Sequence, residues 1–149
     1  MARPVDPEKP LPHAVLGVGR GVVTWDWATA AMRSASGEAQ GFNLTHNQGS
    51  EPERYNECCA WRGERVAALP PVCFTRDDDA RWRVRDRDGR VDLTFVPRVP
   101  HGVPVNALLV ESRYQGPLGT FTGRLAPDGM LPIAVEHWFG MAERFWLRC

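Results

Sequence analysis

The sequence predicts an all-β domain whose antiparallel strands follow one another as a meander that curls into a barrel or stacks as a sandwich. From His13 onward, short apolar runs are separated by Gly, Pro and Asp, a spacing typical of all-β domains. Within these runs apolar and polar residues alternate with period two, the pattern of a half-buried strand. Pairs such as Asp88-Gly89 stand between consecutive runs, where glycine permits the positive φ of a tight hairpin.

The first expected strand, residues 21–28, places Trp25 and Trp27 on one face and Asp26 on the other, because successive side chains of a strand alternate. The same alternation predicts four more strands, at 39–46, 90–96, 107–115 and 119–125.

The expected turns divide these strands. Asp88-Gly89 predicts a hairpin between RWRVR and VDLTF, Gly116-Pro117-Leu118-Gly119 joins two further strands, and Asp128-Gly129 precedes MLPIAVE. Three such turns between consecutive strands indicate a meander.

Two segments are less regular. Residues 97–106 contain three prolines, which confine them to a loop or an edge strand. Residues 137–148 place Trp138, Met141, Ala142 and Phe145 at helical spacing. A short C-terminal helix is therefore an alternative there, but a final strand is favoured by the β pattern that precedes it.

Length and composition predict a single domain. The chain has 149 residues with 43% hydrophobic content, enough for one packed core. Residues 1–12 carry four prolines without periodicity and are expected to form an arm, leaving 13–149 as the domain. Eighteen basic residues balance eighteen acidic ones, which disfavours nucleic-acid binding.

The location predicted from the sequence is the cytoplasm. The N-terminus lacks the apolar segment of a secretory signal, and no apolar run reaches the ~20 residues of a membrane helix. Reduced thiols are then expected. The four histidines are scattered and the cysteines lack CxxC spacing, so no metal site is predicted. A Gly-x-Gly-x-Gly run at 17–21 is not followed by a helical pattern, so no dinucleotide cofactor is predicted.

Two carboxylates are the candidate catalytic residues. Asp26 either points into a ligand cavity, where burial suits it to proton transfer, or lies on a solvated face with the two tryptophans in the core. Glu57 either acts as general acid or base in a pocket, or pairs with one of the many arginines or caps a strand end together with Asn56.

The candidate ligand-binding residues are polar neighbours of these carboxylates and aromatic side chains that could wall an apolar site: Trp25, Trp27, Asn43, His46, Asn56 and Trp61. The alternative is that the tryptophans are core residues, since large aromatics supply much of the buried area of a small domain.

Six blocks carry a resemblance to a known family: TWDWA, GEAQGFNL, NECCAWRGERVAALPPVCF, RWRVRDRDGRVDLTFVP, SRYQGPLGTFTG and FGMAERFWLRC. In order and spacing they resemble the bacterial family called domain of unknown function 2804. The resemblance spans roughly 15–149 and corresponds to the C-terminal half of typical members, so the chain is either a natural half-length form or a fragment. More remotely, the family is similar to two-lobed lipocalin-like proteins that include carotenoid hydratases. This implies a lipocalin-like, calycin-type barrel half.

The chain departs from the family pattern at two places. Glu143, Arg144 and Phe145 stand where relatives usually carry Glu-Asp-His, and Gln115 stands where they often carry a histidine. Any chemistry that those histidines perform in relatives would be missing.

Three functions follow as hypotheses. The first is binding of a hydrophobic small molecule or lipid in a barrel pocket. The second is a terpenoid- or lipid-modifying lyase, hydratase or isomerase with Asp26 and Glu57 as proton-transfer groups. The third is a half-domain stabilised by oligomerisation, with a second copy of the chain as its partner.

Overall fold

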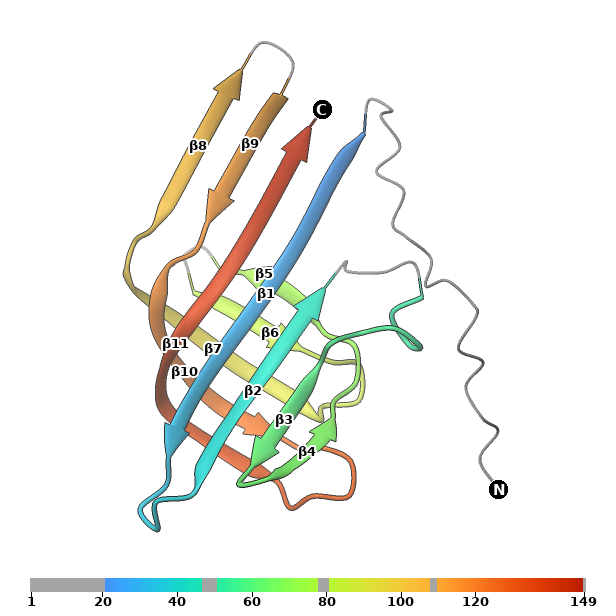
Figure 1. Ribbon diagram of the computed structural model, residues 1–149, viewed down its shortest axis with the longest axis vertical. Coiled ribbons are helices and arrows are strands. Elements are labelled where there is room, and N and C mark those ends of the chain that lie inside the picture. Colours follow the sequence, from blue (N-terminus) through green and yellow to red (C-terminus); the bar gives the residue numbers. More distant parts are fainter. Residues whose placement is uncertain (1–20, 47–50, 78–80, 108–109, 149) are drawn as a thin grey trace.

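The computed structural model describes residues 21–46, 51–77, 81–107 and 110–148, and in these ranges the chain forms strands and no helix. All eleven strands belong to one antiparallel sheet (Figure 1). They are β1 (Val22–Arg33), β2 (Ala39–His46), β3 (Cys59–Arg62), β4 (Arg65–Ala68), β5 (Cys73–Arg76), β6 (Trp82–Arg85), β7 (Val91–Val99), β8 (Gly102–Ala107), β9 (Val110–Gln115), β10 (Leu118–Leu125) and β11 (Ile133–Arg148). The predicted fold class is confirmed.

The sheet curls into a half-barrel with two walls. Its main path runs β4-β3-β2-β1-β11-β10-β7-β6-β5, and among the described residues the end strands β4 and β5 are not paired with each other. Strand β11 joins the walls, because its first part pairs with β10 and its last part with β1. At the crossover Gly119 is paired with Gly140. A Cβ on Gly140 would lie 2.2 Å from the Thr29 carbonyl oxygen, so only glycine permits this close approach of the walls.

Strands β7 to β10 form one long ribbon that bends in the middle. Strand β7 pairs with β10, and β8, which continues β7, pairs with β9. The bend lies at Pro100-His101 on one arm and Gly116-Pro117 on the other (Figure 1). The expectation that Gly116-Pro117 is a turn of the meander is therefore wrong. It joins β9 to β10 without reversing the chain, since both strands run antiparallel to β11.

The predicted proline-rich and C-terminal segments are resolved as strands. Residues 102–107 form the edge strand β8, as the prolines require. The expected strand 107–115 is divided, because Ala107 ends β8, β9 begins at Val110, and residues 108–109 lie outside the described residues. The C-terminal segment lies in β11, and the alternative helix does not form. The predicted strand 39–46 is reproduced as β2, whereas β1 extends five residues beyond the predicted end at residue 28.

A bulge in β11 accounts for the misleading helical spacing near the C-terminus. Thr122 faces two residues of β11, since Phe121 pairs with Trp138 while Gly123 pairs with Val135. His137 has φ 54°, and this extra residue moves the buried positions from odd to even numbers. Ile133 and Val135 precede the bulge on the core face, and Trp138 follows it on the same face.

The core fills the half-barrel between the walls. Phe42 from the first wall meets Phe121 at 5.1 Å between ring centroids, and Phe121 meets Phe95 at 4.6 Å. Trp82 continues this aromatic row at one end, 6.1 Å from Phe95. These four side chains are at most 2% exposed, so the described interior is packed with side chains, and the expected ligand pocket inside the barrel is not found there.

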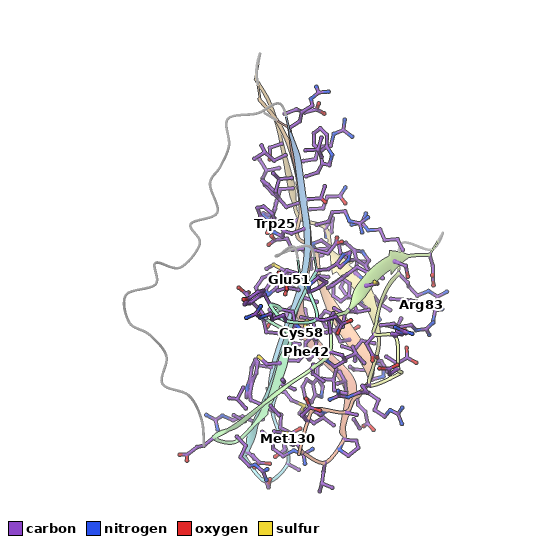
Figure 2. The ribbon with its side chains drawn as sticks, turned by 90° about the vertical axis from the view of Figure 1, so that its right-hand side faces the viewer. Trp25, Phe42, Glu51, Cys58, Arg83 and Met130 are labelled. Carbon is purple, nitrogen blue, oxygen red and sulfur yellow. The ribbon has the colours of Figure 1, made fainter. Side chains whose placement is uncertain are left out.

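Above the core the sheet continues as a single layer. The upper parts of β1 and β11, with β9 and β8, extend beyond the ends of β2 and β5–β7 (Figure 1). Seen edge-on, this part has side chains on both faces, and the described residues form no second layer over it (Figure 2). We call these four paired segments the projecting sheet.

Candidate functional site

Asp26 lies on the concave face of β1, next to the core. Its side chain shares that face with the buried Ala28 and Ala30. In the sheet register its neighbours are His46 of β2 and Arg144 of β11. Asp26 is 7% exposed, so the predicted alternation is confirmed. The alternative that placed Asp26 in solvent and both tryptophans in the core is wrong.

Asp26 is bound by a cation. Arg144 Nε donates a hydrogen bond of 2.7 Å to Asp26 Oδ1. His46 Nδ1 lies 3.7 Å from Asp26 Oδ2 and is buried without a hydrogen-bond partner among the described residues. The guanidinium occupies one oxygen of this carboxylate, so Asp26 acts as a positioning group for Arg144.

A second arginine reaches the same place from the opposite wall. The Arg76 guanidinium carbon lies 3.9 Å from the Trp82 ring centroid, and that of Arg144 lies 5.7 Å from the same ring. Burial lowers the pKa of Arg76, the charge of Arg144 lowers it further, and Asp26 opposes both effects. Two guanidinium groups thus lie close to the same indole at the mouth of the half-barrel.

A groove of about 520 Å³ opens beside this pair. Trp82 and Arg76 form its wall on β5–β6, and the bent ribbon supplies the rest: Pro97, Pro100, His101, Gly102, Gln115 and Pro117. A smaller cavity of about 290 Å³ includes Asp26, Arg144 and Trp146. Gln115 is the register neighbour of Arg144, so the two hollows adjoin along the concave face.

The convex face carries a different pocket, of about 390 Å³, and four of the eight predicted site residues line it. Trp25, Trp27, Asn43, Glu57 and Glu143 line it. Trp27 Nε1 donates a hydrogen bond of 2.6 Å to Asn43 Oδ1, and Trp25 Nε1 donates one of 2.9 Å to Glu143 Oε1. These bonds fix both indoles, so the pocket has rigid aromatic walls and two carboxylates.

Glu143 also holds a tyrosine of the projecting sheet. The Tyr114 hydroxyl donates to Glu143 Oε2 at 3.2 Å. Burial raises the pKa of Tyr114, and the charge and hydrogen bond of Glu143 raise it further. Trp25 stacks on Phe145 with 4.0 Å between the ring centroids. The convex pocket is therefore built on the base of the projecting sheet.

Three predicted ligand-binding residues lie elsewhere. His46 is on the concave face beside Asp26. Asn56 accepts a hydrogen bond from the Cys58 backbone N–H at the start of β3 and donates to the Pro52 carbonyl, which is the strand-end cap considered as its alternative role. Trp61 covers Gly41, where a Cβ would lie 2.1 Å from its ring.

The two proposed catalytic carboxylates do not face each other. Asp26 lies on the concave face, whereas Glu57 is exposed and lines the convex pocket. Trp82 and Trp138 are core residues, while Trp25, Trp27 and Trp61 are half-buried. The core interpretation is therefore correct for Trp82 and Trp138.

Sequence reasoning missed Arg76, Arg144 and the prolines of the groove as site residues. Arg144 was noted only as a departure from the family pattern, and its register position opposite Asp26 is set by strand pairing. The described cysteines, Cys58, Cys59 and Cys73, are free thiols. Burial raises the pKa of Cys58, and no group of three or more metal-ligating side chains occurs in the described ranges. The described part of the chain also contains no helix of the length and apolarity needed to cross a membrane.

The fold and these hollows define an all-β half-barrel domain with a groove at its mouth and a pocket on its convex face. The chain belongs to the family called domain of unknown function DUF2804, which matches residues 5–148. No curated protein matches it. A solved structure from Nitrosomonas europaea, of a candidate AttH protein, is 15% identical, with a TM-score of 0.42 over 99% of this chain. The present chain spans 57% of that protein's length.

Proposed function

We propose that this protein binds a hydrophobic small molecule or lipid in the groove at the mouth of the half-barrel. One observation carries the proposal: a hollow of about 520 Å³ is walled by Trp82 and three prolines. Ligand sites are commonly concave, of roughly 300–1,000 Å³, and lined mainly by apolar groups with few polar ones. Proline side chains and an indole provide such a wall without flexible side chains that lose entropy on binding.

The groove is tested with N-phenyl-1-naphthylamine, a neutral apolar dye whose fluorescence rises in an apolar environment. We expect saturable binding to the purified protein. Gln115 is exposed and lines the groove, so the larger side chain of Gln115→Trp should occupy the space and weaken binding. Arg113→Trp, on the same strand and face but outside the groove lining, is the matched control. Equal dye binding by wild type and Gln115→Trp would place the dye elsewhere and refute the proposal.

The geometry gives less support to a terpenoid- or lipid-modifying enzyme. That hypothesis needs Asp26 and Glu57 to act on one substrate, but they lie on opposite faces of the sheet. Asp26 is paired with Arg144, and Glu57 is exposed. The buried, unpaired carboxylate that proton transfer would require is at neither position.

Self-association is favoured by one feature, the convex face of the projecting sheet. Its register rows place Val23 beside Leu147, and Trp25 beside Phe145. On the outer strands Val103 lies beside Tyr114. Val23 is 40% and Val103 is 50% exposed, and uncovered apolar surface of this kind often marks an interface. Light scattering after size exclusion tests it: a dimer that Val23→Asp converts to monomer supports this function, and a wild-type monomer at high concentration excludes it.

A further inference from the structure

The concave face at the mouth of the half-barrel carries two arginines beside its apolar groove. Arg76 and Arg144 come from opposite walls and approach the same Trp82 ring. Asp26 neutralises one of them, since its Oδ1 accepts from Arg144 at 2.7 Å. Among the described residues no carboxylate forms an ion pair with Arg76.

The position of Arg76 has an electrostatic cost. Arg76 is itself exposed and stacks on an indole that is 2% exposed, and the nearby charge of Arg144 lowers its pKa. Like charges in a partly desolvated site repel each other, and an anion between them would relieve that repulsion while accepting charge-assisted hydrogen bonds. A guanidinium is suited to this role because it offers several donors in one plane.

The apolar and basic parts form one surface. Arg76 and Trp82 themselves line the groove, and Gln115, which also lines it, is the register neighbour of Arg144. A molecule lying against Pro97, Pro100 and Pro117 would therefore place one end at the two guanidinium groups.

Building on the proposed function, we infer that the ligand is an amphiphile with a single anionic head group, bound by Arg76 and Arg144 over Trp82 while its apolar body lies along the groove. A carboxylate at the end of a hydrocarbon body, as in a free fatty acid, fits this arrangement. Asp26 acts as a positioning residue, because its bond to Arg144 Nε directs that side chain.

The test compares two dyes that differ by one charged group. Anilinonaphthalene-8-sulfonate carries a sulfonate on the same aromatic body as the neutral N-phenyl-1-naphthylamine. We expect wild type to bind the anionic dye more tightly, and dodecanoate to displace it better than dodecanol does. Arg76→Gln should weaken binding of the anionic dye about tenfold, as expected for loss of one charge-assisted contact, and should weaken binding of the neutral dye by a smaller factor, because the lost charge matters only to the anionic one.

Arg83→Gln is the control, because it removes the same charge from the adjacent strand β6 at a residue paired with Asp77. It should change neither affinity. Added salt gives a second readout on the wild-type protein alone. It should lower the affinity for the anionic dye and leave the affinity for the neutral dye unchanged, because salt screens charge–charge attraction. Equal binding of both dyes, with no effect of Arg76→Gln, would overturn the head-group inference and leave the groove proposal standing. Failure of both dyes to bind would overturn the groove proposal itself.

Discussion

The part of the sheet that surrounds the core and the part that projects beyond it share two strands but differ in burial. Around the core, β1 and β11 carry Ala28, Ala30 and Ala142, which are at most 3% exposed. In the projecting sheet the same strands carry half-buried Trp25 and Phe145, which stack on each other. Continuous hydrogen bonding along a strand therefore does not make its two ends equally important for stability.

The concave and convex faces of the projecting sheet also differ from each other. On the concave face Arg113 and Arg148 both pair with Glu111, and both approach the Trp146 ring. The convex face has the apolar rows of Val23 and Trp25. An antiparallel sheet with one polar and one apolar face normally covers the apolar one, which is why the convex face, left open by the described residues, is a candidate interface.

The largest expected difference between the two regions is the cost of removing a phenylalanine ring. Phe121→Ala should lower the free energy of unfolding by about 4 kcal/mol, because a fully buried aromatic leaves a cavity between Phe42 and Phe95. Phe145→Ala removes one stacking partner of Trp25 and should cost about 1 kcal/mol. Urea denaturation followed by circular dichroism measures both, and similar midpoints would refute the contrast.

The next largest loss of stability is expected at Gly140, where the two regions of the sheet meet. Gly140→Ala puts a Cβ about where the Thr29 carbonyl oxygen and Ala30 lie, and such overpacking should cost about 3 kcal/mol. Gly37→Ala is the matched change at a turn with φ +84° and open space around it, where the left-handed backbone alone costs about 1 kcal/mol. Thermal unfolding compares the two variants. A Gly140→Ala protein with the wild-type midpoint would show that the two walls can move apart without loss of stability.

The ion pair between Asp26 and Arg144 should contribute less to the free energy of unfolding than the core packing of Phe121 does. Asp26→Asn leaves Arg144 without its carboxylate, and breaking a buried pair costs about 3–5 kcal/mol. Because the Arg144 side chain is 39% exposed, solvent screening reduces the expected loss to about 2 kcal/mol. Asp92→Asn breaks the pair with Arg85, in which both side chains are more than half exposed, and should cost under about 1 kcal/mol. Equal losses in urea denaturation would mean that the concave position of Asp26 has no energetic consequence.

Asp26 also shows how far the sequence could predict this site. Period-two alternation correctly separated Asp26 from Trp25 and Trp27, since that pattern depends only on the strand. It does not say which face is inside. That depends on the partner strands: Arg144 pairs with the buried carboxylate, while the tryptophans donate hydrogen bonds to Glu143 and Asn43 on the convex face.

Local signals were reliable for hairpins and failed where pairing is long-range. Gly89 and Gly129 adopt the positive φ expected of their turns. Gly116-Pro117 has the same local chemistry but joins two strands end to end, because the 16-residue strand β11 pairs with both. The groove likewise depends on the bend that brings Pro100 near Arg76, and such contacts between distant residues leave no local pattern.

The smallest expected effect is spectroscopic and tests the bond between the regions on the convex face. The pKa of Tyr114 is raised by burial and by Glu143, so Glu143→Gln should lower the midpoint of its tyrosinate absorbance titration. A Tyr55→Phe background isolates the signal, since the chain has two tyrosines, and Glu111→Gln on β9 is the control for net charge. The sign for stability follows: the unfolded chain releases this proton first, so Tyr114 lowers the free energy of unfolding as the pH rises through the ordinary tyrosine pKa of about 10. A Glu143→Gln midpoint equal to that of Glu111→Gln would show that Tyr114 and Glu143 are not bound to each other, and that the convex pocket is not anchored to the projecting sheet at this point.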